Sequence, residues 1–344
     1  MSAPTLTSPA PDSPPNAAPD SKSPSLRGLS FWIFAKVTAR QHRWTVVAAL
    51  ALTAVTVAVL AGSVYWSGRA EDILKATGCA MGSEARRCLQ PTGDYVDAVW
   101  QARHMVEYVA FGLLLLPAVV SGYLAGPLVA RELETGTYKL AWTQSASPAR
   151  WLAARLAAPA AFVTVLVMIV TLVFRWSWSG GVADDFPTFV YEPTVYVSLP
   201  GPVPVATVLC GLAIGALTGL LIRRTLPALL TSTLVTGGVI VTFLSYRHAL
   251  WPTETLTGQA LGNRSARTWV VEQGMLTPSG QKISMADCNW DGDCLTRQGG
   301  VTDYAEVHPQ SHFWPLQLVE AGILLALAAL VVLAAFRVLR SRLP

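Results

Sequence analysis

The sequence predicts an all-α integral membrane protein with six transmembrane helices. Only 13% of the 344 residues are charged and 52% are hydrophobic, whereas soluble domains are about 25% charged. The apolar residues gather in solid runs, each close to the roughly 20 residues that a helix needs to cross a bilayer. Strands of a membrane barrel would alternate apolar and polar residues instead. The runs occupy 45–66, 108–130, 156–174, 203–222, 226–246 and 316–336.

The N-terminal region is polar and precedes the membrane domain. Residues 1–28 are rich in Pro, Ser and Ala, which predicts a disordered cytoplasmic tail. The first apolar run begins too deep in the chain for a cleaved signal peptide, so we expect it to stay as an anchor. The basic residues of 30–43 recur on one helical face, which predicts a short interfacial helix. The membrane domain is therefore expected to cover 29–344.

The distribution of charge predicts the orientation of the spans. Lys and Arg outnumber Asp and Glu at both termini and in the links 131–155 and 223–225. By the positive-inside rule, these segments are cytoplasmic in a multi-pass protein of the cell membrane. The predicted outer loops are then 67–105, 175–202 and 247–315. The net charge of +4 results from the excess of Lys and Arg in these cytoplasmic segments. We therefore expect the partner to be the lipid bilayer and not nucleic acid.

The fourth span carries a small residue at every fourth position. Gly211, Gly215 and Gly219 lie on one helical face, and this spacing lets another helix approach closely. We therefore expect these glycines to be a helix-packing surface, against a helix that the sequence does not specify.

Two acidic residues lie at or within the predicted spans. Glu107 precedes the second apolar run, and Glu320 lies one turn inside the last. A carboxylate inside the membrane is energetically costly, which makes both residues functional candidates. An ion pair, contact with water, a part in an outer gate and simple hydration at the interface all remain open. A membrane enzyme that uses the two carboxylates as acid and base is an alternative.

The cysteines of the predicted outer loops are expected to form disulfides. Cys79 and Cys88 lie in the first of these loops, and Cys288 and Cys294 in the last. Because that compartment is oxidising, four thiols there favour two bridges. Local pairing is the favoured arrangement, with pairing between the loops as the rival. Cys210, inside the fourth span, is expected to be a small packing residue.

The stretch around Cys288 resembles part of a calcium-binding loop. Asp287, Asn289 and Asp291 match its first, third and fifth positions, and Asp293 follows. Gln298 stands at the twelfth position, where such loops have a bidentate Glu. A weak calcium site and a polar turn closed by a disulfide are the two interpretations.

The sequence contains no phosphate-binding loop of the form G-x-x-x-x-G-K-[ST], and no Gly-Lys dipeptide. The lysine and the backbone amides that hold a triphosphate in such loops are therefore missing. We expect that this chain is not an enzyme and binds no cofactor of its own.

The segment between the second and third spans reads ARELETGTYKLAWTQSASPARWLAARL, which is polar, with charges of both signs. This segment resembles permease subunits of ATP-binding-cassette exporters, the type 2 permease class, of the kind found in Streptomyces-like actinobacteria. The segments RGLSFWIFAKVTARQHRW, before the first span, and FWPLQLVEAGI, entering the last, share the resemblance.

The resemblance implies an assembly of several subunits. Such permeases work as pairs of six-helix units, either homodimers or heterodimers, with separate cytoplasmic ATPases that bind ATP. The loop after the second span couples to the ATPase. Carried onto this chain, the coupling residues would be Arg131, Glu132, Glu134, Gly136, Thr137 and Tyr138.

The function expected from the sequence is therefore that of an exporter permease for a substrate that the sequence does not identify. A membrane-anchored sensor or binding protein that uses the loop 247–315 is an alternative. A secondary transporter would predict internal inverted repeats, and we see none in the sequence.

Overall fold

The computed structural model describes most of the chain. The described residues are 43–83, 85–138, 147–179, 199–264 and 268–342. The predicted tail 1–28 and all of the interfacial segment 30–43 except its last residue lie outside them.

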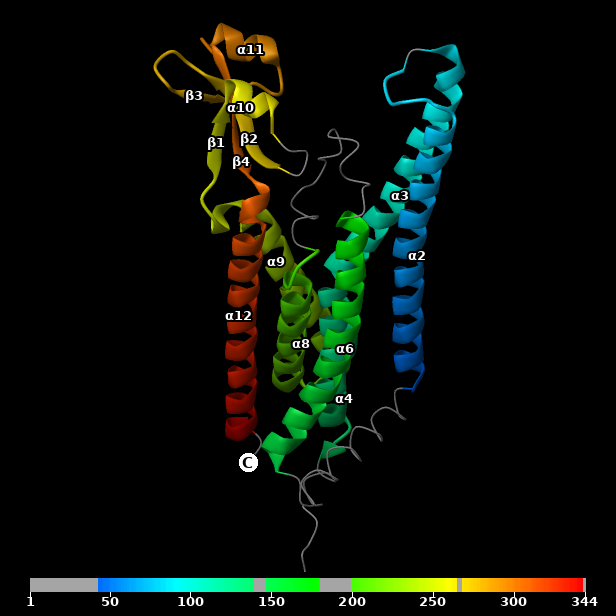
Figure 1. The fold of residues 1–344 in the computed structure, drawn as a ribbon. Coiled ribbons are helices and arrows are strands. Elements are labelled where there is room, and N and C mark those ends of the chain that lie inside the picture. The colour runs from blue at the N-terminus through cyan, green and yellow to red at the C-terminus, as the bar shows by residue number, and fades with distance from the viewer. Residues whose placement is uncertain (1–42, 84, 139–146, 180–198, 265–267, 343–344) are drawn as a thin grey trace, which may run out of the picture. The chain divides into compact units, whose positions relative to one another are not determined.

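Six helices in the described part of the chain are long and apolar enough to cross a membrane, which confirms the prediction of six membrane-spanning helices (Figure 1). The second crossing consists of three consecutive pieces, because a π-helical turn separates two α-helices. The elements are α2 (Arg43–Ala76), α3 (Arg86–Val119), η1 (Val120–Ala125), α4 (Gly126–Glu134), α6 (Pro148–Ser179), α8 (Val203–Ile222), α9 (Thr225–Tyr246) and α12 (Phe313–Arg342).

The first two helices are longer than the predicted spans. Each has 34 residues, or about 50 Å at 1.5 Å per residue, which exceeds the roughly 30 Å of the hydrocarbon core. Most of the predicted loop 67–105 is therefore helical. Charged residues such as Arg69 and Glu71 end an apolar run without ending a helix, since Arg and Glu are good helix formers.

Helix α8 is the most buried of the six spans. It packs against α3, η1, α4, α6, α9 and α12. Arg223, with φ of 56°, adopts the left-handed conformation directly after α8, and α9 begins two residues later. Because only Arg223 and Arg224 connect them, α8 and α9 form a tight antiparallel hairpin.

The all-α prediction is wrong for the segment between α9 and α12, which contains a small antiparallel sheet. The sheet has four strands in the order β1-β4-β2-β3, with a bulge in β2 between Val270 and Glu272. The sequence does not reveal the strands because their burial does not alternate: β4 buries both Ala305 and its neighbour Tyr304. The elements are β1 (Glu254–Thr257), α10 (Gly258–Gly262), β2 (Trp269–Leu276), β3 (Lys282–Ser284), α11 (Gly292–Arg297) and β4 (Thr302–His308).

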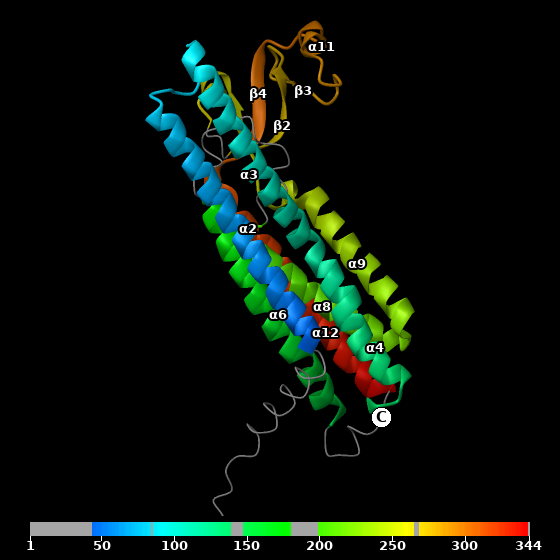
Figure 2. The same ribbon diagram turned by 90° about the vertical axis from the view of Figure 1, so that its right-hand side faces the viewer.

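Two short 3₁₀ turns connect the sheet to the spans. η3 (Arg247–Leu250) follows α9, and η4 (Gln310–His312) precedes α12. Figures 1 and 2 both show the sheet at the ends of α9 and α12 that lie away from α4. The two ends of the spans are therefore called the sheet end and the α4 end.

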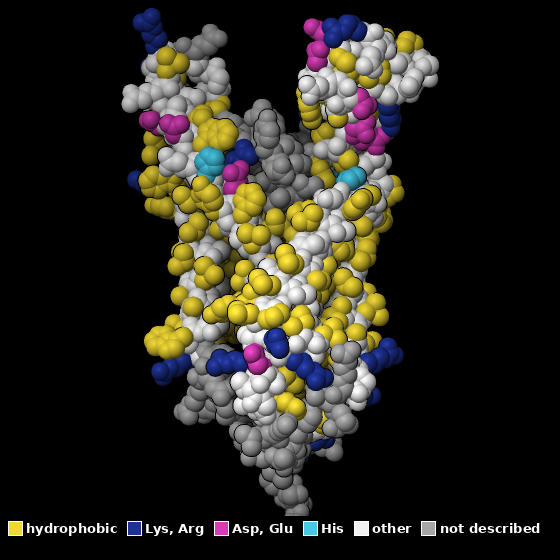
Figure 3. All heavy atoms as spheres, turned by 180° about the vertical axis from the view of Figure 1, so that it is seen from behind, with side chains coloured by type: hydrophobic (Ala, Val, Ile, Leu, Met, Phe, Trp, Pro, Cys, Tyr) yellow, Lys and Arg dark blue, Asp and Glu magenta, His cyan; other side chains and the backbone are white. Residues whose placement is uncertain are grey.

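The surface of the helices is suited to a bilayer. Figure 3 shows hydrophobic side chains over the middle of the spans, with a band of Lys and Arg near the α4 end and a mixture of basic and acidic side chains toward the sheet end. Large apolar side chains such as Phe111, Leu234 and Leu330 are more than half exposed. Because lipid solvates such side chains, this pattern supports the assignment of the six helices as membrane spans.

Candidate functional site

The predicted coupling segment begins on the last turn of α4, where Glu132 connects α4 to α6. Its carboxylate accepts a hydrogen bond of 2.9 Å from Nε1 of Trp151 and forms an ion pair with Arg155. Trp151 is buried, and it packs with Val129 in a core cluster at the α4 end. Glu132 therefore fixes the end of α4 against the first turns of α6.

Glu134 connects the same turn to a third helix. Its carboxylate accepts hydrogen bonds from the backbone N of Thr225, at 2.9 Å, and from Oγ1 of that residue, at 2.6 Å. Thr225 is the first residue of α9, and Arg224 before it provides no side-chain cap. Glu134 thus caps α9 from a distant part of the sequence, where an anion is favoured by the helix dipole.

The rest of the described coupling segment lies on the last turn of α4 or just beyond its end. Gly136 has φ of +72°, a left-handed conformation that ends helices and favours glycine. Oγ1 of Thr137 lies 3.1 Å from Oγ1 of Thr135. Tyr138 packs against the core cluster at the α4 end, and Arg131 is exposed on α4. Residues 139–146 of the predicted docking loop lie outside the described residues.

Glu320 has a partner that the sequence analysis did not identify. Its carboxylate receives two hydrogen bonds from the Arg247 guanidinium, Nε to Oε2 at 2.6 Å and Nη2 to Oε1 at 2.7 Å. Both side chains are almost fully buried, with 3% and 2% exposed. This paired geometry neutralises two charges that would otherwise be strongly disfavoured among apolar helices.

A cavity among α3, α8, α9 and α12 borders this ion pair. Its lining is almost entirely apolar, and Arg247 and Thr207 are polar groups on its wall. The lining also includes Leu113, Val203 and Phe243.

Glu107 also has basic neighbours. Its carboxylate accepts a hydrogen bond of 2.8 Å from Nε of Arg103 and lies 3.1 Å from Nδ1 of His104. The Arg103 guanidinium in turn lies 5.3 Å from the centre of the Trp100 ring. Both membrane acids therefore have ion-pair partners.

The glycines of α8 pack against the second crossing. A Cβ atom on Gly211 would lie 2.6 Å from the carbonyl oxygen of Pro117, and one on Gly215 2.5 Å from that of Ser121. One on Gly219 would lie 2.7 Å from the carbonyl oxygen of Gly126. The helix that the sequence left unspecified is thus the α3–η1–α4 segment, whose backbone approaches α8 closely along the whole glycine face.

The π-helical turn η1 places a polar residue at this contact. Oγ1 of Thr236 donates a hydrogen bond of 2.9 Å to Oγ of the buried Ser121. Ser232 lies within 3.3 Å of the same residue. Turns of this kind often mark functional positions in long helices, and no periodic signal in the sequence predicts this one.

The structure contains both disulfides in the local pairing that the sequence favours. Cys79 is bonded to Cys88, which closes the turn between α2 and α3, and Cys288 is bonded to Cys294. Cys210 is free and buried.

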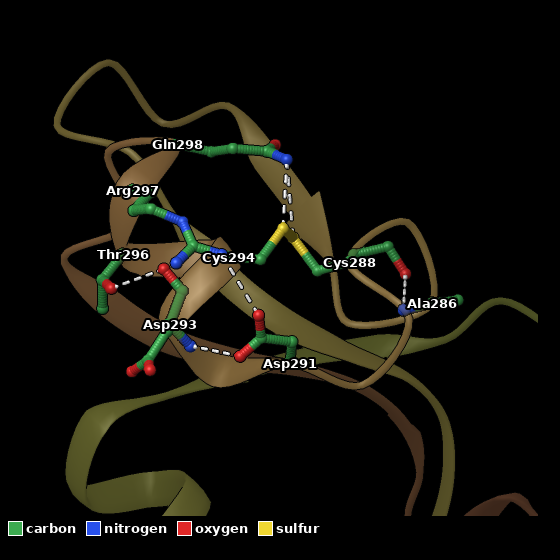
Figure 4. The surroundings of a disulfide bond; sticks show 9 residues. Ala286, Cys288, Asp291, Asp293, Cys294, Thr296, Arg297 and Gln298 are labelled. Carbon is green, nitrogen blue, oxygen red and sulfur yellow. Dashed lines mark hydrogen bonds and ion pairs between the residues drawn. A yellow bond between two sulfur atoms is a disulfide. The ribbon is translucent and has the colours of Figure 1, made fainter.

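The candidate calcium residues are arranged as a helix cap. Asp291 accepts a hydrogen bond of 3.0 Å from the backbone N of Asp293 and pairs with Arg297 at 3.2 Å. Figure 4 shows the Asp293 carboxylate pointing away from Asp291. Asn289 has φ of 49°, and Asp287 precedes the disulfide. Among the described residues, no group of three or more His, Cys, Asp or Glu is placed to hold a metal ion.

These features define a polytopic membrane protein with a capped helix junction at one end of its spans and a disulfide-bonded sheet at the other. Residues 41–247 match the model of the family described as ABC-2 membrane transporter related. The chain belongs to this family and is a membrane transporter permease. Membrane components of this family generally work with an ATPase partner. Comparison with curated proteins finds no match, and neither does comparison with solved structures.

Proposed function

We propose that this chain is the permease subunit of an ATP-driven exporter, of the kind found in Streptomyces-like actinobacteria, and that a separate ATPase docks on residues 131–150. The family match supports the permease role. The observation that carries the docking site is the pair of contacts at the end of α4. Glu132 binds α6 and Glu134 binds α9, so one short segment is attached to three spans.

These contacts give a physical route from the ATPase to the membrane. A force on the coupling segment acts on α6 through Trp151 and Arg155, and on α9 through Thr225. Two permease units, in a homodimer or a heterodimer, would then rock between inward-open and outward-open states. ATP is bound and hydrolysed by the partner, and this chain contributes no catalytic residue or cofactor.

The proposed orientation places the α4 end in the cytoplasm. Basic residues lie at the end of α4, the start of α6, the α8–α9 link and the end of α12. These positions meet at the α4 end, where Figure 3 shows the cationic side chains. The positive-inside rule then makes both termini cytoplasmic and the sheet external.

The test is co-purification from native membranes in mild detergent, with the bound proteins identified. A stoichiometric ATPase is expected. Arg131→Glu reverses an exposed charge on α4 and is expected to lower ATPase recovery at least about tenfold, the effect of roughly 1.4 kcal/mol. Asp94→Arg, an equally drastic change at an exposed position of α3, should leave recovery unchanged. Equal recovery with both variants would contradict the docking site.

A second candidate function is ligand binding by the external sheet. The family match ends at residue 247, so both the sheet and α12 lie outside the matched region. A chain that purifies without an ATPase would favour this sensor function. The ion pairs of Glu107 and Glu320 give both acids structural roles, so they add no support to the membrane-enzyme alternative.

A further inference from the structure

A cluster of ionisable side chains lies where the sheet joins the spans. His308 ends β4, and His312 lies in η4, directly before α12. Glu254 begins β1, and His248 lies in η3, directly after α9. Both connections between the sheet and the membrane helices therefore contribute to one cluster.

The contacts in this cluster form a continuous chain. Nε2 of His308 lies 3.0 Å from the carbonyl oxygen of His248, and Nδ1 of His308 lies 3.2 Å from Nδ1 of His312. Nε2 of His312 lies 3.2 Å from Oε1 of Glu254. The Trp269 ring covers His308, with the ring centres 5.0 Å apart.

The chemistry of imidazole determines how many protons these linked side chains hold. A carbonyl oxygen only accepts, so Nε2 of His308 carries a proton. The two Nδ1 atoms face each other, so a hydrogen bond between them requires a proton on one of the two and a lone pair on the other. Oε1 of the Glu254 carboxylate accepts, so Nε2 of His312 carries the third proton of this arrangement. The two rings therefore hold one proton more than two neutral histidines, and Glu254 balances that charge.

We propose that the proton between the two Nδ1 atoms of His308 and His312 holds the external sheet to the start of α12. One further proton, bound on acidification, then opens this contact. With four protons, both Nδ1 atoms carry hydrogen, so their hydrogen bond is lost and two cations face each other. His308 and His312 then separate, which frees η4 from the end of β4.

The surroundings oppose this second proton near neutral pH. His308 is buried, and this burial holds the pKa of its imidazole below the ordinary 6.5. The hydrogen bond to the His248 carbonyl acts against this shift, and the positive charges of His312 and His248 add to it. Of the charges nearby, Glu254 is paired with His312, and Arg247, adjacent to His248 in the sequence, is neutralised by Glu320. Opening is therefore expected below pH 6.5, not at neutrality.

η3 keeps the opened sheet attached to the spans. This turn is held on one side by His308, through the His248 carbonyl, and on the other by the Arg247–Glu320 pair with α12. Acid in the external medium would thus loosen the sheet while the buried ion pair holds α9 and α12 together.

The test is backbone hydrogen–deuterium exchange of the full-length protein in lipid nanodiscs at pH 7.5 and 5.5, corrected for intrinsic exchange rates. In peptides that cover 302–312, exchange is expected to rise at least about tenfold on acidification, the effect of one pKa unit of coupling. His312→Asn keeps a hydrogen-bonding side chain without a charge and is expected to reduce this rise to less than about twofold.

Two further variants make the test specific. His248→Asn keeps the carbonyl acceptor and should keep the acid response, with its midpoint moved to higher pH because a neighbouring positive charge that lowers the pKa of His308 is removed. Glu254→Gln removes the balancing anion and should move the midpoint of opening to lower pH. Either of the following overturns the proposal: no acid response in the natural protein, or a response that survives in His312→Asn or disappears in His248→Asn. If His312→Asn does not fold, Glu254→Gln provides the test. A midpoint of opening at the same pH as in the natural protein, or at a higher pH, then overturns the proposal. Exchange reports on the joint alone, so the outcome is independent of transport.

Discussion

The Arg247 guanidinium and the Glu320 carboxylate depend on each other, because each is almost fully buried. Glu320→Ala leaves an uncompensated buried cation, for which we expect a loss of about 3–5 kcal/mol. The double variant Arg247→Met with Glu320→Leu removes both charges and should recover most of this loss. Thermal unfolding of the three proteins in the same nanodiscs measures the difference. A double variant as unstable as Glu320→Ala would show that the pair itself is required.

The glycine face of α8 gives a second prediction at the residue scale. Gly215→Ala places a methyl group 2.5 Å from the Ser121 carbonyl oxygen, which forces α8 and η1 apart and should destabilise the protein by about 1–3 kcal/mol. Gly237→Ala on α9 is the matched control, because, apart from its chain neighbours and the adjacent backbone of α9, no atom of the described residues lies within 4 Å of the position that its Cβ would take. The same unfolding assay applies, and equal losses would contradict the close approach.

The sequence identifies a single residue as a functional candidate only where that residue type is unusual for its position. Glu320 is a candidate from the sequence because one carboxylate within an apolar run is conspicuous. Its partner Arg247 directly follows a predicted span, where cations are common at membrane boundaries. The pairing joins residues 73 positions apart, and no local pattern encodes it. The same holds for Glu134 and Thr225, which are 91 positions apart.

Among the elements, the sheet should lose stability in acid because the Glu306 carboxylate becomes protonated. This carboxylate in β4 accepts hydrogen bonds from Lys282, Thr253 and Thr255, which hold its pKa below the ordinary 4.5 despite partial burial. A carboxyl whose pKa is lower in the folded state stabilises the protein above the unfolded value, and this contribution is lost as the pH falls through the folded value. The loss therefore begins near pH 4.5, below the range of the histidine site.

Glu306→Gln isolates this effect from that of the histidines. The variant should have a less stable sheet at pH 7 and a smaller further loss below pH 4.5 than the natural protein. Hydrogen exchange of the β1–β4 peptides measures both quantities, and Glu71→Gln, an exposed acid of α2, is the control. Parallel losses below pH 4.5 in the two variants would show that Glu306 is not responsible.

The elements differ in how far the sequence predicts them. The predicted fourth span, 203–222, has the bounds that α8 has in the structure, because turn-forming residues and charges flank it closely. The sequence does not predict the ends of α2 and α3, since hydropathy marks where apolar residues stop and not where a helix stops. It does not predict the strands between α9 and α12 either, because β3 has only three residues and the longer strands lack strict alternation.

At the scale of the whole molecule, the two ends of the spans differ in chemistry. At the α4 end basic residues outnumber acidic ones and α4, α6 and α9 meet, whereas the sheet end has charges of both signs, both disulfides and the small sheet. Disulfides persist in oxidising compartments, and cations favour the cytoplasmic side. Two independent kinds of chemistry therefore favour the same orientation, with the sheet outside.

Cysteine labelling in intact cells tests this orientation for the whole chain. The native cysteines do not interfere, because four are in disulfides and Cys210 is buried. Ser279→Cys introduces a thiol at an exposed position of the β2–β3 turn, and a membrane-impermeant maleimide should label it in intact cells. Thr137→Cys, exposed beyond α4, should react only after permeabilisation. The opposite pattern would place the α4 end outside, where no cytoplasmic ATPase could reach it.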